Sequence, residues 1–293
     1  MNTTRFFFAV LVLSAMLFVA CTTDFDVQLD SISPELVVDG AVTTDTTAHT
    51  VYLKKTGAYF CDQPADVVTG AMVTLSDGLN TVVLKEDSTE KGAYRTAANY
   101  YGIVGRTYTL TIGSVDINND GKKETYTASS IIEEVPSVEK INVSKEIVFY
   151  ENVWAINVWM HDPAGISNYY LTKAFKNDVC LSDTITEWNI MTDSFFNGVD
   201  LCNRTIMYLP SNIKTEKIHS GDKVGLELCG ISEDYYSFIS EVQQEAGERN
   251  PLFGGQPANV RTNVKQIFPT NTTGSPRGYF AAYSISRAQT IYQ

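Results

Sequence analysis

Histidine and cysteine are scarce in this chain of 293 residues, and basic side chains are outnumbered by acidic ones. The chain has three His and five Cys, and 22 Lys and Arg against 34 Asp and Glu. The formal net charge of −12 argues against nucleic acid as a partner and against flat contact with anionic lipid. Because the cysteines form no CxxC pair and the histidines are dispersed, we expect no zinc site.

The motifs of common catalytic and nucleotide-binding sites are also missing. We find no nucleophile elbow, P-loop, dinucleotide fingerprint or zinc-protease motif. His161 and Asp162 are neighbours, but adjacent residues on a strand face opposite sides, so they fit a strand end followed by a turn. We therefore predict that the chain is not an enzyme. A hydrolase with two carboxylates drawn from distant positions is the alternative.

The apolar run at residues 6–20 is too short to cross a bilayer as a helix, which needs about 20 apolar residues. It follows the basic Arg5 and ends at a small residue, Ala20. A basic start, a short apolar stretch and a small-residue cleavage site predict a secretory signal peptide over residues 1–20. The polar residues 22–26 come next, without the Lys or Arg cluster of a membrane-spanning segment.

Cys21 directly follows the predicted cleavage site. This position resembles the lipobox of bacterial lipoproteins, in which the cysteine carries a diacylglycerol on its thiol and a third acyl chain on its amine. Three acyl chains exceed the two signals that stable membrane anchoring needs. We therefore predict lipidation at Cys21 and a lipidated tether over residues 21–34, which ends at Pro34.

Most of the remaining sequence has the pattern of β-strands. Short β-rich segments are separated by turn residues at spacings of roughly 8–12 residues, which is typical of a β-sandwich. Asp77-Gly78 between two such segments predicts a hairpin. We expect a mainly β fold, with an Ig-like β-sandwich over residues 35–135 and a second β-rich domain over residues 136–293. Pro136 marks the expected boundary.

One segment of the second region has helical periodicity. Ser232 can cap a helix, acidic residues follow it, and Gly247 comes just after the expected end. Tyr235 and Ile239 lie on one helical face. We predict one helix near residues 233–246, packed against a sheet.

The run that starts at Asp116 matches the first half of a calcium-binding loop. Asp116, Asn118 and Asp120 occupy positions 1, 3 and 5, and Gly121 occupies position 6. Thr127 stands where the bidentate acid of such a loop belongs. The alternative is a polar hairpin tip, which uses the same residue types without a metal. Calcium would be a structural ion here, and no cofactor is required.

The cysteines permit disulfide bonds in an exported protein. Four remain after acylation of Cys21, and four allow three connectivities. They are Cys61, Cys180, Cys202 and Cys229. Our preferred pairing is Cys180 with Cys202, because both flank one loop-rich segment.

Aromatic side chains are plentiful, and most of them are expected in the core. Phe195 and Phe196 lie in a loop-like run between Asp193 and Gly198. They are therefore our candidates for contacting a partner.

Several short motifs follow one another in a recognisable order. They are Val38-Asp39-Gly40, the run from Gly70 to Gly78, the run from Gly92 to Thr96, the run from Gly105 to Leu110, Asp162-Pro163, Asn168-Tyr169-Tyr170, Phe196-Asn197-Gly198 and Tyr235-Tyr236. Together they resemble a Bacteroidetes outer-membrane lipoprotein family, domain of unknown function 4249, over roughly residues 25–292.

The resemblance implies a lipoprotein held in the outer membrane through Cys21, often encoded beside a TonB-dependent transporter. It implies no catalytic residues. We expect a surface-exposed accessory or substrate-binding subunit that contacts a TonB-dependent receptor. A structural or adhesive surface lipoprotein without a transport role is the alternative.

Overall fold

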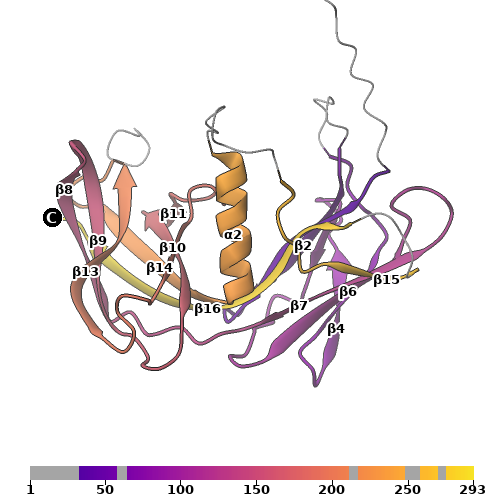
Figure 1. The fold of residues 1–293 in the computed structure, drawn as a ribbon, viewed down its shortest axis with the longest axis horizontal. Coiled ribbons are helices and arrows are strands. Elements are labelled where there is room, and N and C mark those ends of the chain that lie inside the picture. Colours follow the sequence, from indigo (N-terminus) through magenta and orange to yellow (C-terminus); the bar gives the residue numbers. More distant parts are fainter. Residues whose placement is uncertain (1–32, 58–64, 211–216, 248–257, 270–274) are drawn as a thin grey trace, which may run out of the picture. The chain divides into compact units, whose positions relative to one another are not determined.

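The computed structural model describes residues 33–57, 65–210, 217–247, 258–269 and 275–293. Strands dominate in this part of the chain, which contains one helix (Figure 1). The expectation of a mainly β fold is therefore confirmed. The first strands are β1 Leu36–Thr43, β2 Thr50–Lys55, β3 Met72–Ser76, β4 Thr81–Glu86, β5 Ala93–Arg95, β6 Thr107–Val115 and β7 Glu124–Ile131. The later elements are β8 Lys140–Val148, β9 Glu151–His161, β10 Tyr169–Lys176, β11 Val179–Cys180, β12 Asn189–Thr192, β13 Asp200–Pro210, β14 Lys223–Ile231, α2 Glu233–Ala246, β15 Lys265–Phe268 and β16 Arg277–Ile291.

The predicted hairpin at Asp77-Gly78 is present between β3 and β4. Gly78 has a φ of 85°, which glycine adopts without steric cost. The Asp77 carboxylate accepts hydrogen bonds from the backbone amides of Leu79 and Asn80 at 3.0 and 2.7 Å. The turn is therefore fixed by local chemistry that the sequence displays.

Most strands of the described residues belong to one sheet. Twelve of its thirteen strands follow the order β11-β10-β14-β16-β1-β2-β5-β4-β3-β6-β7-β15, and the thirteenth, β12, pairs with β10. The long strand β16 lies between β14 and β1 and so joins the two parts of this sheet. Its first half runs parallel to β1, and its second half runs antiparallel to β14.

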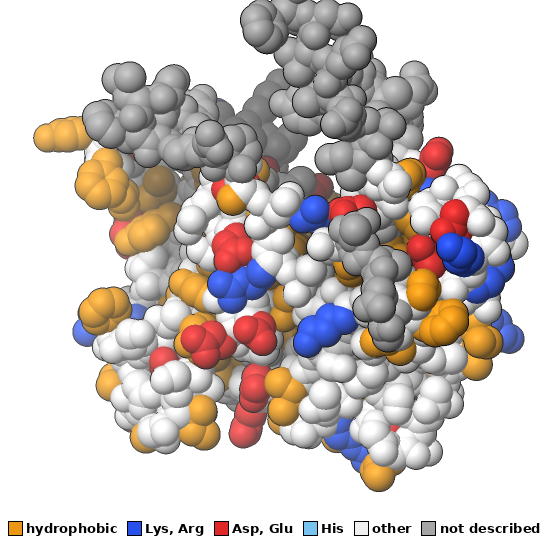
Figure 2. All heavy atoms as spheres, turned by 45° about the vertical axis from the view of Figure 1, so that its right-hand side comes forward, with side chains coloured by type: hydrophobic (Ala, Val, Ile, Leu, Met, Phe, Trp, Pro, Cys, Tyr) orange, Lys and Arg blue, Asp and Glu red, His pale blue; other side chains and the backbone are white. Residues whose placement is uncertain are grey.

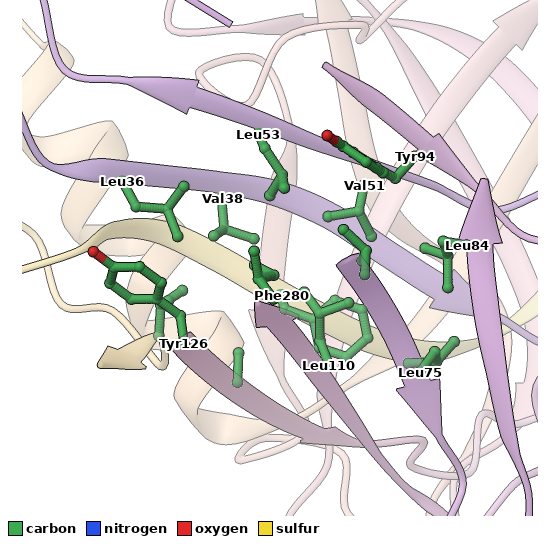
Figure 3. Close-up of a cluster of buried hydrophobic side chains, with 14 of the residues drawn as sticks. Leu36, Val38, Val51, Leu53, Leu75, Leu84, Tyr94, Leu110, Tyr126 and Phe280 are labelled. Carbon is green, nitrogen blue, oxygen red and sulfur yellow. The ribbon is translucent and has the colours of Figure 1, made fainter. Parts of the chain in front are cut away.

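The first hydrophobic core lies among β1 to β7 and the first half of β16. The backbone amide of Ala282 on β16 donates to the Ser130 hydroxyl of β7 at 3.0 Å, so this run of strands folds back on itself. Alternate side chains point inward, as β periodicity requires. Figure 3 shows those it labels: Leu36, Val38, Val51, Leu53, Leu75, Leu84, Tyr94, Leu110, Tyr126 and Phe280. A β-sandwich-like arrangement fits this core.

The second core lies between a separate sheet, β13-β9-β8, and the strands β10 and β14. Trp154, Ile156 and Val158 of β9 alternate into it. Leu226 and Leu228 of β14 approach from the opposite side.

The helix α2 is present where the sequence predicts it. The Ser232 hydroxyl accepts a hydrogen bond from the Tyr235 amide, which satisfies one of the free donors at the helix start. Tyr235, Phe238 and Ile239 are its buried residues. They pack on the faces of β10, β14 and β16 that point away from the second core.

The division into domains at Pro136 stays a prediction. The described residues all lie in one unit, Ser33–Gln293. Two elements that follow Pro136 pair with strands that precede it, namely β15 with β7 and the first half of β16 with β1.

Candidate functional site

A cleft of about 680 Å³ lies beside α2. This volume is within the usual range of ligand sites, about 300–1,000 Å³. The helix provides one wall, and β7, β15, β16 and the segment that precedes β15 provide the others. The lining residues are Thr127, Ala128, Ser129, Asp234, Glu241, Asn259, Arg261, Thr262, Asn263, Lys265 and Tyr279.

Tyr279 is the aromatic residue of this lining and is only 6% exposed. Its ring centroid lies 5.0 Å from that of Tyr235 and 4.9 Å from that of Phe238, so α2 packs directly on it. Burial raises the pKa of the Tyr279 hydroxyl to about 12. Tyr279 is therefore a neutral, rigid part of the cleft wall at neutral pH.

The wall segment before β15 is held by side-chain hydrogen bonds to strands. The Asn263 amide donates to the carbonyl oxygens of Ser129 and Phe280 at 3.0 and 2.7 Å and accepts from the Phe280 amide at 3.0 Å. The Thr262 hydroxyl donates to the carbonyl of Gly278 at 2.7 Å. Because these bonds connect β7 and β16 to the segment, the cleft wall is pre-formed.

The pair Arg261 and Glu241 joins this segment to α2. The backbone amide and the Nε atom of Arg261 donate to the Glu241 carboxylate at 2.7 and 2.8 Å. The backbone hydrogen bond and the guanidinium lower the pKa of Glu241. A general acid of a glycosidase needs a raised pKa, so Glu241 is not suited to that role.

The cleft therefore has the properties of a binding site for a polar ligand. The exposed side chains of Asp234 and Lys265 add one charge of each sign to its rim. On the face shown in Figure 2, acidic and basic side chains are interspersed with each other and with apolar ones. Neither charge dominates that face.

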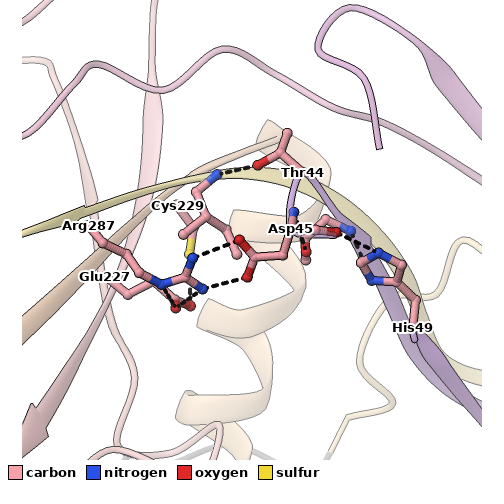
Figure 4. Close-up of polar contacts among 8 residues, drawn as sticks. Thr44, Asp45, His49, Glu227, Cys229 and Arg287 are labelled. Atoms are coloured by element: carbon pink, nitrogen blue, oxygen red, sulfur yellow. Dashed lines mark hydrogen bonds and ion pairs between the residues drawn. The ribbon is translucent and has the colours of Figure 1, made fainter. Parts of the chain in front are cut away.

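A network around Arg287 joins the loop between β1 and β2 to the second half of the chain (Figure 4). The Arg287 guanidinium donates to both Asp45 and Glu227. The Cys229 thiol lies 3.7 Å from a Glu227 oxygen. Burial raises the pKa of Cys229 well above its ordinary value, so this thiol stays protonated.

The candidate calcium residues lie at the tip of the hairpin between β6 and β7. The Asp116 carboxylate accepts from the amides of Asp120 and Gly121, each at 3.0 Å, and Asn118 accepts from the Asp120 amide at 3.1 Å. These bonds are those of a polar turn. No group of three or more His, Cys, Asp or Glu suited to a metal occurs among the described residues.

The two aromatic candidates of the 193–198 loop have different environments. Phe195 is 99% exposed. Phe196 is half-buried and stacks on Tyr170 with ring centroids 6.4 Å apart. Phe196 therefore anchors the loop in the second core, and Phe195 is left free to contact a partner.

The predicted bond between Cys180 and Cys202 is not formed in the described chain, where both are free thiols. Cys180 lies on β11 and donates to the Ser182 carbonyl. Cys202 lies on β13, which belongs to the other sheet. Flanking one segment in sequence therefore does not bring these residues onto the same sheet. Cys61 and Cys21 lie outside the described residues.

Sequence reasoning missed the cleft. Its lining comes from four separate stretches of chain, and no single stretch carries a binding motif. The richness of residues 258–264 in Asn and Thr indicates only a loop. Asp234 and Glu241 are seven positions apart, so they lie on the same face of the helix. This spacing was the one sequence feature that pointed to an acidic face beside the cleft.

Fold and site together define a mainly β protein with one packed helix and a polar cleft beside it. A family model described as "Domain of unknown function (DUF4249)" matches residues 22–289. Since this match spans most of the chain, the protein belongs to the DUF4249 family. Comparison with curated proteins found no match. No helix in the described part of the chain is long and apolar enough to cross a membrane.

Proposed function

We propose that this protein is a surface-exposed lipoprotein, anchored in the outer membrane of a Bacteroidetes bacterium through Cys21, that serves a TonB-dependent transporter as an accessory or substrate-binding subunit. The observation that carries the proposal is the pre-formed polar cleft of about 680 Å³ beside α2. A rigid cleft with charges of both signs suits capture of a polar ligand. Tethering beside a transporter raises the effective concentration of such a ligand at its entrance.

The anchor is part of the same proposal. The lipobox-like position of Cys21 supports triacylation, and the acidic chain argues against membrane binding through a charged face. Replacing Cys21 by Ala should release the protein from the membrane fraction. Retention of the variant in that fraction would contradict the anchor.

Uptake by cells tests the role of the cleft. In a strain that lacks the gene, the intact protein should restore growth on the substrate of the neighbouring transporter. Asp234→Ala with Lys265→Ala removes two exposed charges of the rim and leaves the Arg261–Glu241 pair in place, and this variant should restore growth poorly. Asp183→Ala with Lys123→Ala makes the same charge change at exposed positions outside the cleft and should restore growth fully.

Two outcomes would count against the proposal. If deletion leaves uptake intact and changes attachment of the cells, the alternative of an adhesive lipoprotein is favoured. If the rim and control variants restore growth equally, the cleft is not the binding site.

A further inference from the structure

The hairpin between β8 and β9 ends in two aromatic residues, Phe149 and Tyr150. Val148 pairs with Glu151, so only these two residues form the turn. Their side chains are 92% and 100% exposed. Ile147, which precedes them on β8, is 72% exposed. The tip therefore presents three large apolar side chains to solvent.

The backbone of this turn disfavours the residues that occupy it. Phe149 and Tyr150 have φ values of 49° and 70°. A two-residue turn with positive φ at both positions strongly prefers Asn, Asp and Gly. Positive φ in a bulky residue is a genuine outlier, and such strained positions cluster at functional sites.

The same chain contains a matched comparison. Asn177 and Asp178 join β10 to β11 with φ values of 49° and 69°. Nearly the same geometry is therefore built there from residues that favour it. Neither Phe149 nor Tyr150 takes part in an aromatic or cation–π contact within the described residues. We therefore find no packing contact of these rings that would stabilise the fold.

The strands below the tip are paired with each other up to the turn. β8 and β9 are paired from Lys140 to Val148. Ile141 and Val143 of β8 and Ile156 of β9 lie in the second core. An aromatic pair on a turn between paired strands has less backbone entropy to lose on binding than one on an unpaired loop.

The charges near the tip indicate the chemistry of its partner. Glu146 and Glu151 flank the apolar residues. The nearby Lys145 ammonium lies 5.9 Å from the Trp154 ring centroid, over the side of the hairpin. Two carboxylates disfavour insertion into a bilayer that contains anionic lipid and favour a basic surface.

We propose that Phe149 and Tyr150 are the docking anchor for a protein partner that has an apolar pocket rimmed by Lys or Arg. Aromatic side chains of this kind dominate binding energy at protein interfaces. The proposed function supplies the expected partner, a TonB-dependent transporter. The docking role itself is inferred only from the exposure, the backbone and the flanking charges of Phe149 and Tyr150.

Photo-crosslinking in living cells tests this inference. A photoreactive amino acid is placed at position 149 or 150 of the full-length protein, and at Leu79 as a control. Leu79 is a 77% exposed apolar residue at another hairpin. We expect one defined protein adduct from positions 149 and 150 and none from position 79. An adduct with lipid, or the same adducts from all three positions, would overturn the proposal.

The double variant Phe149→Asn, Tyr150→Gly separates docking from folding. Because it removes an unfavourable turn, its Tm should rise by about 2–4 °C. It should bind the crosslinked partner at least about 30-fold more weakly, as loss of an aromatic hot spot implies. An unchanged affinity would overturn the inference.

The two proposals can fail separately. If the intact protein co-purifies with a TonB-dependent transporter and the double variant does so equally well, the docking role is wrong and the proposed function stands. If a different protein forms the adduct and no TonB-dependent transporter co-purifies with the intact protein, the docking role stands and the transporter role is wrong.

Discussion

Arg287 and Asp45 are joined by two hydrogen bonds, although 242 positions separate them in the chain. Nη1 donates to one Asp45 oxygen at 2.7 Å and Nη2 donates to the other at 2.5 Å. The same guanidinium donates to Glu227 of β14 through Nε and Nη2, at 3.1 and 2.7 Å. One side chain thereby connects the loop after β1 to two strands of the second half.

Replacing Arg287 by Ala should destabilise the protein. Glu227, whose side chain is only 9% exposed, would lose its cationic partner. Leaving a largely buried carboxylate unpaired costs about 2–3 kcal/mol of unfolding free energy, which urea denaturation can measure. Lys122→Ala removes an exposed ion pair with Asp120 and should change the free energy by less than about 0.5 kcal/mol. Equal effects of the two substitutions would contradict the role of Arg287.

Acid should weaken the fold through His49. Burial lowers the pKa of His49 below its ordinary value of 6.5. Its Nδ1 atom accepts a hydrogen bond from the Thr43 amide at 3.4 Å. His49 is therefore protonated more readily in the unfolded chain than in the folded protein. The free energy of unfolding decreases as the pH drops below about 6.5. The Tm should decrease from pH 7 to about pH 5, and it should decrease less in His49→Asn.

Asp45 contributes nothing to the change in Tm between pH 7 and about pH 5, because it titrates at lower pH. The hydrogen bonds from Arg287 lower the pKa of Asp45 below its ordinary 3.8. Its stabilising contribution is therefore complete above that value and is lost only as the pH falls further. If His49→Asn keeps the full slope of the wild type above pH 5, His49 is not the group responsible.

Short sequence motifs predicted the turns and the helix. They could not predict which strands pair when those strands are far apart in the chain. Asp77-Gly78 and Ser232 act on neighbours a few positions away, so their effect is visible in the sequence. The parallel pairing of β16 with β1 joins residues about 240 positions apart and has no local signature. The Phe149-Tyr150 turn could not be predicted, because its residues oppose the turn that they form.

The described cysteines should differ in reactivity. Cys202 is exposed, Cys180 is half-buried and Cys229 is fully buried with a raised pKa. Iodoacetamide on the native protein, followed by peptide mass mapping, should label Cys202 fastest and Cys229 only after unfolding. If both Cys180 and Cys202 react only after a reductant is added, the two are joined by the disulfide that the sequence predicted.

Calcium should have little effect on the hairpin tip. Both oxygens of the Asp116 carboxylate already accept backbone amides, and Glu124 accepts from Tyr126 and from the Ile117 amide. We expect the Tm in about 1 mM calcium to equal the Tm after chelation. A rise in Tm with calcium that Asp116→Asn abolishes would show that the loop binds the ion.

Co-purification from native membranes shows whether the lipoprotein binds a TonB-dependent transporter. The native lipoprotein is extracted from cell membranes with a mild detergent, isolated through a C-terminal tag, and its bound proteins are identified by mass spectrometry. We predict a TonB-dependent transporter in amounts comparable to the lipoprotein, and its absence when Cys21 is replaced by Ala and the protein leaves the membrane. Recovery of the intact, membrane-anchored protein without any outer-membrane transporter would show that the protein does not act as a transporter subunit.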